Sequence, residues 1–184
     1  DYESPGCGSS SNTCTVIVRA SDAASSANTA DRTFTITIGD LNDQTPSYSR
    51  SSGDLTKNYA ESATSAIDSF SITDTDTGNS FVCNVGGDDS GDVSCSISST
   101  TVTLSFASQP NYESAADNGG NNVYDFTVSI SDASSGGNTG STLTYEITVT
   151  DVNEFDVSTP TDSNSGSNTV AENAADNAAV GITA

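Results

Sequence analysis

Histidine and tryptophan are absent from this chain of 184 residues, and only four of its residues are Lys or Arg. Against 25 Asp and Glu, these four give a formal net charge of −21. Nucleic acids and anionic membrane surfaces bind proteins through basic patches, so this composition excludes both as partners. The sequence also has no run of about 18 apolar residues, which excludes direct membrane insertion by a spanning helix in this segment.

Common signatures of enzyme active sites are missing as well. The sequence contains no Gly-rich phosphate loop, no Gly-x-Ser-x-Gly and no His. The adjacent Asp88 and Asp89 raise glycoside hydrolysis as an alternative, which needs two carboxyl groups held across a cleft, one of them with a raised pKa. Both lie in a polar turn, where we expect nothing to desolvate them. We therefore predict that the protein is not an enzyme.

The four cysteines form two local pairs, Cys7 with Cys14 and Cys83 with Cys95. Neither pair is a Cys-x-x-Cys, and without His the chain lacks the usual ligands of a zinc site. We predict a disulfide within each pair, with buried free thiols as the alternative. Cys83 and Cys95 fall on two strand-like segments joined by a Gly- and Asp-rich turn, which favours a hairpin. Disulfides indicate an oxidising compartment, so we expect a secreted protein, extracellular or on the cell surface.

Apolar residues alternate with Thr and Ser through most of the chain, and Gly, Asn, Asp and Ser clusters separate the alternating segments. The 33% hydrophobic content and the high charge raise the alternative of disorder, but the periodicity of the apolar residues favours a folded chain. No segment has a convincing helical period. The expected strands lie around Leu55–Ala60, Ser69–Thr73, Phe81–Val85, Val93–Ile97, Thr101–Phe106, Val123–Ile130 and Leu143–Thr150. Short strands at this spacing predict an all-β sandwich.

The sequence also repeats itself at an interval of 110 or 111 residues. The matching segments are Asp1-Tyr2-Glu3 with Asn111-Tyr112-Glu113, Ala20-Ser21-Asp22 with Ile130-Ser131-Asp132, and Tyr59-Ala60-Glu61 with Val170-Ala171-Glu172. We therefore expect the C-terminal part of one repeat over residues 1–47, a complete repeat over 48–155 and the N-terminal part of the next over 156–184. Because Asp1 is not Met and no signal-peptide pattern follows it, we expect an internal piece of a longer product.

A cluster of oxygen-bearing side chains follows a strand pattern at two places. Asp40-Leu41-Asn42-Asp43-Gln44-Thr45-Pro46 comes after the alternating residues 34–38, and the weaker copy Asp151-Val152-Asn153-Glu154 comes after residues 145–149. Carboxylates and carbonyls are the ligands of Ca²⁺, which takes 6–8 oxygens. Each cluster therefore predicts a linker that becomes ordered when it binds a hard cation.

These motifs, in this order and at this period, resemble the cadherin repeat over essentially the whole chain. The similarity is carried by a Glu near the first strand, Asp-x-Asp after the second, Asp/Asn-Tyr-Glu before the sixth and Asp-x-Asn-Asp at the end. The segment 170–184 is most similar to bacterial cadherin-like repeats of long secreted proteins. The resemblance implies tandem seven-strand Greek-key β-sandwiches of the cadherin or Ig-like type.

The resemblance also implies three Ca²⁺ ions at each junction between consecutive repeats. Carried over residue by residue, the ligands of the first junction are Asp1, Glu3, Asp40, Asn42, Asp43, Asp74, Asp76 and Asp132, with a backbone carbonyl near Gly78–Ser80 as a further candidate. Those of the second junction are Glu61, Asn111, Glu113, Asp151, Asn153 and Glu154. Asp22 serves the preceding junction, and Glu172 matches Glu61 in the following repeat.

The second junction departs from the family pattern at Asn111 and Glu154, so its calcium occupancy is expected to differ from that of the first. At either junction, converging carboxylates repel one another strongly without cations, and Ca²⁺ turns this repulsion into bridging. Metal binding is then linked to the order of the linker, which is a hinge without Ca²⁺ and stiff with it. The other acids (Asp88, Asp89, Asp92, Asp117, Asp162 and Asp176) match no ligand position and are interpreted as solvated turn residues.

The leading functional hypothesis is an extracellular, calcium-rigidified structural or adhesive module in a long stalk, filament or surface adhesin. Its expected partners are neighbouring repeats of the same chain, with homotypic or filament self-association as a further option. One alternative is a module that binds carbohydrate or a receptor through loop aromatics such as Tyr48, Tyr59 and Tyr112. Only 7% of the residues are aromatic, which weakens that alternative. Another is a filament subunit that assembles by strand exchange between protomers.

Overall fold

The computed structural model describes residues 1–6, 12–50, 54–78, 80–133 and 137–182. Cys7 lies outside these ranges, so the predicted disulfide between Cys7 and Cys14 is not part of the description. The chain divides into two compact units, Asp1–Val152 and Asn153–Ala184. All regular structure in the described residues is β-sheet apart from two short 3₁₀ helices, as the all-β prediction required.

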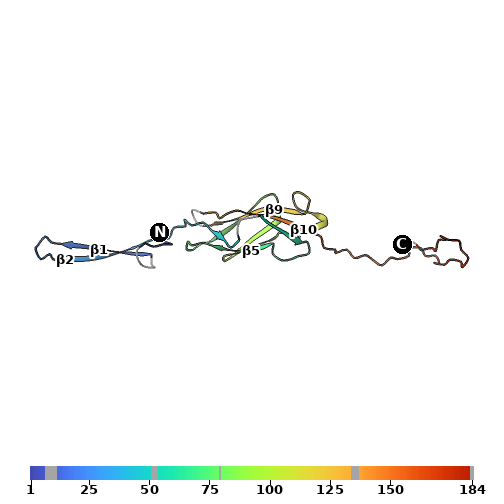
Figure 1. The fold of residues 1–184 in the computed structure, drawn as a ribbon, viewed down its shortest axis with the longest axis horizontal. Helices are drawn as coiled ribbons and strands as arrows, with labels where there is room; N and C mark the ends of the chain where they lie inside the picture. The colour runs from blue at the N-terminus through green and yellow to red at the C-terminus, as the bar shows by residue number, and fades with distance from the viewer. Residues whose placement is uncertain (7–11, 51–53, 79, 134–136, 183–184) are drawn as a thin grey trace. The chain divides into compact units, whose positions relative to one another are not determined.

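Figure 1 shows the strands along the chain. They are β1 (Thr13–Ser21), β2 (Thr29–Thr37), β3 (Ser47–Tyr48), β4 (Asp54–Ala60), β5 (Asp68–Thr73), β6 (Phe81–Gly86), β7 (Val93–Ser98), β8 (Thr101–Phe106), β9 (Val123–Asp132) and β10 (Leu143–Thr150), with 3₁₀ helices η1 (Ser90–Asp92) and η2 (Tyr112–Ser114). The seven strands expected from residue 55 onward are confirmed as β4 to β10. The additional β3 has two residues, too few to show an alternating pattern.

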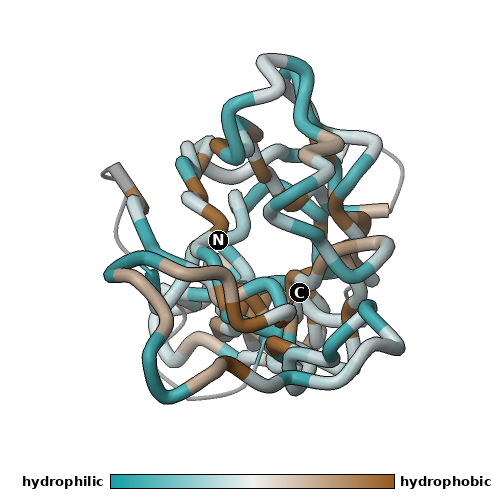
Figure 2. The backbone as a smooth tube through the Cα atoms, turned by 90° about the vertical axis from the view of Figure 1, so that its right-hand side faces the viewer, coloured by the Kyte–Doolittle hydropathy of each residue, from teal (hydrophilic) through white to brown (hydrophobic). Residues whose placement is uncertain are grey.

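Two four-stranded sheets pack face to face as a sandwich, in the orders β4-β10-β9-β6 and β3-β5-β8-β7. Within them β4 runs parallel to β10, and the other pairs are antiparallel. Alternate residues face the core, as the burial of β5 and β10 shows. In Figure 2 hydrophobic and hydrophilic residues accordingly alternate in short steps along the backbone. The fully buried side chains are Tyr124, Tyr145, Phe126, Leu104, Ile130, Leu143, Ile147, Val102, Val128 and Val149.

The disulfide between Cys83 and Cys95 is present, but the expected hairpin around it is wrong. β6 pairs with β9 and β7 pairs with β8, so the connection through η1 crosses from one sheet to the other. The disulfide joins β6 and β7, the edge strands of the two sheets, with a Cα–Cα distance of 6.3 Å. It therefore links the two sheets at one side of the sandwich and does not connect two paired strands of a hairpin.

The interpretation of Asp89 and Asp117 as solvated turn residues is also wrong. Asp89 is 3% exposed and Asp117 is 6% exposed. The Asp89 carboxylate accepts hydrogen bonds from the backbone N–H groups of Asn118 and Asp125, both at 2.6 Å. The Asp117 carboxylate accepts from the N–H groups of Asn121 and Asn122 at 3.0 and 2.9 Å. These bonds satisfy the N–H groups of three loop residues and of Asp125 in β9, so both acids are structural.

The hairpin of β1 and β2 repeats the pairing of β9 and β10. Val16 lies opposite Phe34 in the first hairpin, and the residues at the same repeat positions, Phe126 and Tyr145, lie opposite each other in the second. Burial differs, however: Val16 is 43% exposed and Phe34 46%, whereas Phe126 and Tyr145 are 1% and 0% exposed. The same hairpin thus occurs once inside a sandwich and once with its apolar face open in the described structure.

Tyr48 of β3 connects the two sheets near the end of β9. Its hydroxyl accepts a hydrogen bond from the Ile130 N–H at 2.9 Å and donates to the Ile130 carbonyl at 3.4 Å. Gly140 lies against this contact, and a Cβ atom there would meet the Tyr48 hydroxyl and, at 2.6 Å, the Pro46 carbonyl. The position therefore has no room for any side chain.

We expect Gly140→Ala to destabilise the complete repeat by about 2 kcal/mol, because the added methyl forces Tyr48 or the backbone of Pro46 to move. Thermal unfolding followed by circular dichroism measures this effect. Gly91→Ala is the matched control, since a Cβ at that position meets no atom within 4 Å. Equal melting temperatures for the two variants would contradict the prediction.

The second unit has no strand among its described residues 153–182. The described residues of the chain also contain no helix that is long and apolar enough to cross a membrane.

Candidate metal centre

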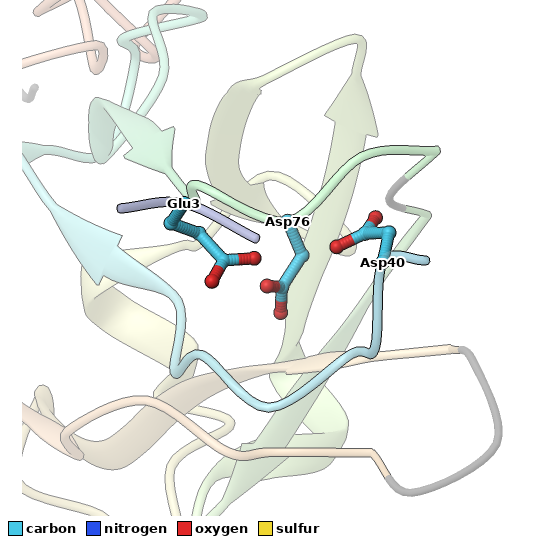
Figure 3. Close-up of side chains that lie close together, drawn as sticks. All are labelled: Glu3, Asp40 and Asp76. Atoms are coloured by element: carbon cyan, nitrogen blue, oxygen red, sulfur yellow. The ribbon is translucent and has the colours of Figure 1, made fainter. Parts of the chain in front are cut away.

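Acidic side chains from three separate segments meet close to the sandwich. Glu3 comes from the N-terminal segment, Asp40 follows β2, and Asp76 lies in the loop after β5. Each offers a carboxylate oxygen within 4.8 Å of the others. Figure 3 shows the three carboxylates pointing toward one another. Local sequence explains these positions, because the Asp-rich segments after strands leave the sheets as turns.

Several of the converging oxygens are buried without a hydrogen-bond donor. Among the described residues, this holds for one carboxylate oxygen each of Glu3, Asp40, Asp74 and Asp132. Asp132, at the end of β9, is only 5% exposed. A buried carboxylate oxygen that receives neither a proton donor nor water costs about 1–3 kcal/mol or more. A hard cation removes that energetic cost, because it binds several such oxygens at once.

The remaining oxygens of the cluster are held by the backbone and by short polar side chains. The Thr77 N–H donates to Asp40 Oδ2 at 2.9 Å, and the Thr77 hydroxyl donates to the same atom. The Gln44 N–H donates to Asp76 Oδ2 at 2.9 Å, and the Asp76 N–H donates to Asp74 Oδ1 at 3.0 Å. Each of these contacts fixes the orientation of a carboxylate, as hydrogen bonds to metal-ligating groups commonly do.

The Asn42 amide faces the same carboxylates. One of its two terminal atoms lies 2.9 Å from Asp76 Oδ2 and 3.1 Å from Asp132 Oδ2. With nitrogen in that place, Asn42 donates to both acids. With oxygen there, three oxygens converge, an arrangement that a cation between them stabilises. The contact therefore places Asn42 in the cluster under either orientation.

The electrostatics of the site show the cost of bringing these acids together. Burial first, and then the nearby carboxylates of Asp74 and Asp76, raise the pKa of Asp132. A backbone hydrogen bond lowers the pKa of Glu3, but burial and the charges of Asp43, Asp76 and Asp40 raise it above its usual value overall. The two hydrogen bonds from Thr77 lower the pKa of Asp40 instead. Burial and neighbouring negative charge thus both oppose the ionisation of Glu3 and Asp132.

The other predicted ligands of the first junction lie at its exposed rim. Asp1 Oδ1 accepts a hydrogen bond from the Glu3 N–H at 3.3 Å. Asp43 Oδ1 accepts from the Gln44 side-chain amide at 2.6 Å. Within the predicted range Gly78–Ser80, the Ser80 carbonyl accepts from the Ala133 N–H at 2.8 Å, and residue 79 lies outside the described residues. The structure thus brings Glu3, Asp40 and Asp76 together most closely, with Asn42 and Asp132 beside Asp76.

Glu61 is the central acid of the second set. It is 5% exposed, and its carboxylate accepts from the Tyr112 N–H at 2.6 Å and the Val152 N–H at 2.8 Å. A carboxylate oxygen of Glu113 lies within 4.8 Å of one of Glu61. The Asn111 side chain caps η2 by accepting from the Ser114 N–H at 2.9 Å, and Asp151 is exposed. Glu61 thereby fixes the start of the linker that follows β10.

The remaining predicted ligands lie elsewhere. Asp22, in the loop between β1 and β2, accepts hydrogen bonds from the Asn28 side chain, which lowers its pKa. Asn153, Glu154 and Glu172 belong to the second unit, where all three are exposed.

Sequence reasoning missed the residues that orient the acids. Thr77 and Gln44 are adjacent to predicted ligands, and a donor side chain directly after Asp-Thr-Asp was an available signal for Thr77. Asn138 donates from its side chain to the Gln44 carbonyl at 2.8 Å, although 94 residues separate the two in the sequence. No local pattern indicates such a contact.

Comparisons with known proteins show the fold. No protein-family model matches the sequence, and a search of curated proteins found no match. Among solved structures, mouse cadherin-23 EC22-24 matches with a TM-score of 0.61 and 23% identity over 84% of this chain and 45% of that one. The human desmocollin-1 ectodomain matches with a TM-score of 0.60 and 22% identity over 78% of this chain and 28% of that one.

A protocadherin gammaB7 EC3-6 cis-dimer structure matches with a TM-score of 0.59 and 21% identity, over 78% of this chain and 32% of that one. The chain thus spans less than half the length of each of these proteins. At these identities the similarity shows the fold alone, which is that of cadherin ectodomain repeats.

Proposed function

We propose that the chain is an extracellular structural or adhesive module whose repeats are stiffened by Ca²⁺ at their junctions. The observation that carries this proposal is the group of buried carboxylate oxygens of Glu3, Asp40, Asp74 and Asp132, which meet no hydrogen-bond donor among the described residues. Side chains from before and after the 40–46 linker contribute to the same group. A cation bound there holds both sides of the linker.

The chemistry of the donors favours calcium over other metals. Carboxylate, amide and backbone carbonyl oxygens are hard ligands, and the site contains neither thiolate nor imidazole. Glu3, Asp40, Asn42, Asp74, Asp76 and Asp132 would hold the ions, with Asp1 and Asp43 at the rim. The bound charge would neutralise carboxylates that otherwise repel one another, and it would couple metal binding to the order of the linker.

The repeat boundaries follow from the same proposal. Residues 1–47 are the C-terminal part of one repeat, 48–155 a complete repeat and 156–184 the N-terminal part of the next. The shared register of β1–β2 and β9–β10 supports the first assignment. The open apolar face of the first hairpin supports it too, because its counterpart in the complete repeat is covered by the second sheet. The partners of the module are then neighbouring repeats.

Calcium titration of the 184-residue protein by calorimetry tests the proposal. We expect saturable binding, and we expect EGTA to lower the melting temperature and increase flexibility in small-angle scattering, because the repelling carboxylates lose their counterions. Asp88→Asn serves as the control variant, since Asp88 is exposed and outside the site. Absence of calcium binding, or identical melting with and without EGTA, would exclude the proposed function.

A further inference from the structure

The chain contains two copies of one hairpin loop, between β1 and β2 and between β9 and β10. Both begin with Ser-Asp-Ala and end with Asn-Thr, at residues 21–29 and 131–139. Both close through the same backbone contact: the Asp22 N–H donates to the Asn28 carbonyl at 3.1 Å, and the Asp132 N–H donates to the Asn138 carbonyl at 3.0 Å. Because this closure uses backbone atoms, it leaves the asparagine side chain available for another role.

In the first loop that side chain binds the aspartate of its own loop. Asn28 Nδ2 donates to Asp22 Oδ2 at 2.8 Å, and the Asn28 N–H donates to Asp22 Oδ1 at 3.0 Å. Both carboxylate oxygens of Asp22 therefore have donors.

In the second loop the side chain binds the linker instead. Asn138 Nδ2 donates to the Gln44 carbonyl at 2.8 Å, and the Gln44 N–H donates to Asp76 Oδ2 at 2.9 Å. Asp132 Oδ1 then has no donor among the described residues, although Asp132 is almost fully buried. The two loops thus show the same asparagine with two alternative partners.

The acceptor that the Asn138 side chain binds matters for the electrostatics of the site. A hydrogen bond to a carboxylate is roughly twice as strong as one to a neutral carbonyl, so Asn138 binds a weaker acceptor than its counterpart Asn28 does. This choice is favourable once a cation compensates the charge of Asp132. Without the cation, the arrangement seen at Asn28 and Asp22 becomes the better one for the second loop as well.

We propose that Asn138 is a positioning residue that docks the 40–46 linker through the Gln44 carbonyl when the carboxylates hold a cation, and that it returns to Asp132 when the cation leaves. The metal-dependent part of this proposal rests on the proposed function, whereas the docking of the linker does not. Asn138 would thereby connect occupancy of the site to attachment of the linker, without itself binding the ion.

The test is amide hydrogen exchange at Gln44, measured by NMR on the 184-residue protein in EGTA and in saturating Ca²⁺. In Ca²⁺ we expect Asn138→Ala to accelerate exchange of the Gln44 N–H about fivefold, because the linker loses the hydrogen bond from Asn138 to the Gln44 carbonyl. In EGTA we expect the same variant to leave this exchange rate unchanged. We expect its calcium affinity to fall about tenfold. Asn28→Ala is the matched control and should change neither quantity. Asn138→Gln keeps the amide donor and should restore part of the protection.

Each result decides a separate point. Unchanged Gln44 exchange in Ca²⁺ for Asn138→Ala overturns the docking role. Acceleration of the same size in EGTA shows a permanent contact and overturns the switch, while leaving the proposed function intact. Calcium titration of the unaltered protein tests the proposed function separately. Because the loop closes through backbone atoms, Asn138→Ala is expected to fold, and its melting temperature in EGTA checks this.

Discussion

Asp132→Asn is expected to change the stability of the protein in opposite directions with and without calcium. In EGTA the variant should melt at a higher temperature than the unaltered protein, because it removes a buried negative charge beside Asp74 and Asp76 and supplies an amide donor. In saturating Ca²⁺ it should melt at a lower temperature. The loss of one carboxylate ligand should weaken calcium binding by about 100-fold, since affinity follows the charge of the ligand set.

Differential scanning calorimetry under both conditions measures this reversal. At a calcium concentration of about 100 times the dissociation constant, binding stabilises the folded state by about 2.7 kcal/mol, and most of this would be lost in the variant. Asp88→Asn removes an exposed charge that is not part of the cluster and should show no reversal. A fall in melting temperature of equal size in EGTA and in calcium would mean that Asp132 is only a structural acid.

The second large effect is expected at Asp68, a buried acid that links the two sheets. Asp68 on β5 forms ion pairs with Arg50 and, at 3.0 Å, with Lys57 on β4. The Tyr145 hydroxyl on β10 donates to Asp68 Oδ2 at 2.9 Å. Two of the four basic residues of the chain are therefore directed at one carboxylate. We expect Asp68→Asn to destabilise the protein by about 3 kcal/mol, because it leaves two cations without their partner.

The destabilisation caused by Asp68→Asn is expected to depend on pH. Burial raises the pKa of Asp68, but the hydrogen bonds from Lys57 and Tyr145 and the charges of Lys57 and Arg50 outweigh it and hold the pKa below its usual value. A carboxylate with a lowered pKa stabilises the folded state above its unfolded pKa of about 3.9, and this stabilisation is lost as the pH falls through the folded pKa. The difference between the unaltered protein and Asp68→Asn should therefore be full at pH 7 and shrink in acid.

Urea unfolding of both proteins in EGTA from pH 7 to pH 3 checks this dependence, and the comparison removes the contribution of the other carboxylates. A difference in unfolding free energy that stays constant over this range would show that the charge of Asp68 is not what stabilises the sandwich. Ser69→Ala is a suitable control, since it changes the neighbouring residue and keeps the carboxylate.

Residue patterns were sufficient to place β4 to β10, because the period of two is a local property of a chain that lies between a core and solvent. β8 and β10 match the predicted ranges, and the other strands from β4 to β9 differ by one or two residues at their ends. The pairing of β6 and β7 was not predictable in this way. Which sheet a strand joins depends on edges supplied by β8 and β9, and the turn between the two strands carries no information about those edges.

In the candidate site, too, some features were predictable from local patterns and others were not. Its acids were proposed from the order and spacing of short motifs, and carboxylate oxygens of three of them, Glu3, Asp40 and Asp76, lie within 4.8 Å of one another in the structure. The contacts of Thr77, Gln44 and Asn138 were not identified, nor was the burial of Asp89. Each of these depends on a donor and an acceptor that meet only after the sheets have packed.

By itself, the sequence determined that this is an all-β chain with an internal repeat, a large net negative charge and many oxygen-bearing side chains in its predicted linkers. These properties follow from composition and from periods that each segment carries alone. Only the tertiary structure decided which carboxylate oxygens are buried without a donor among the described residues, because burial and hydrogen bonding depend on segments distant in the chain. The oxygens left in that state, on Asp132 and its neighbours, are those that we assign to calcium.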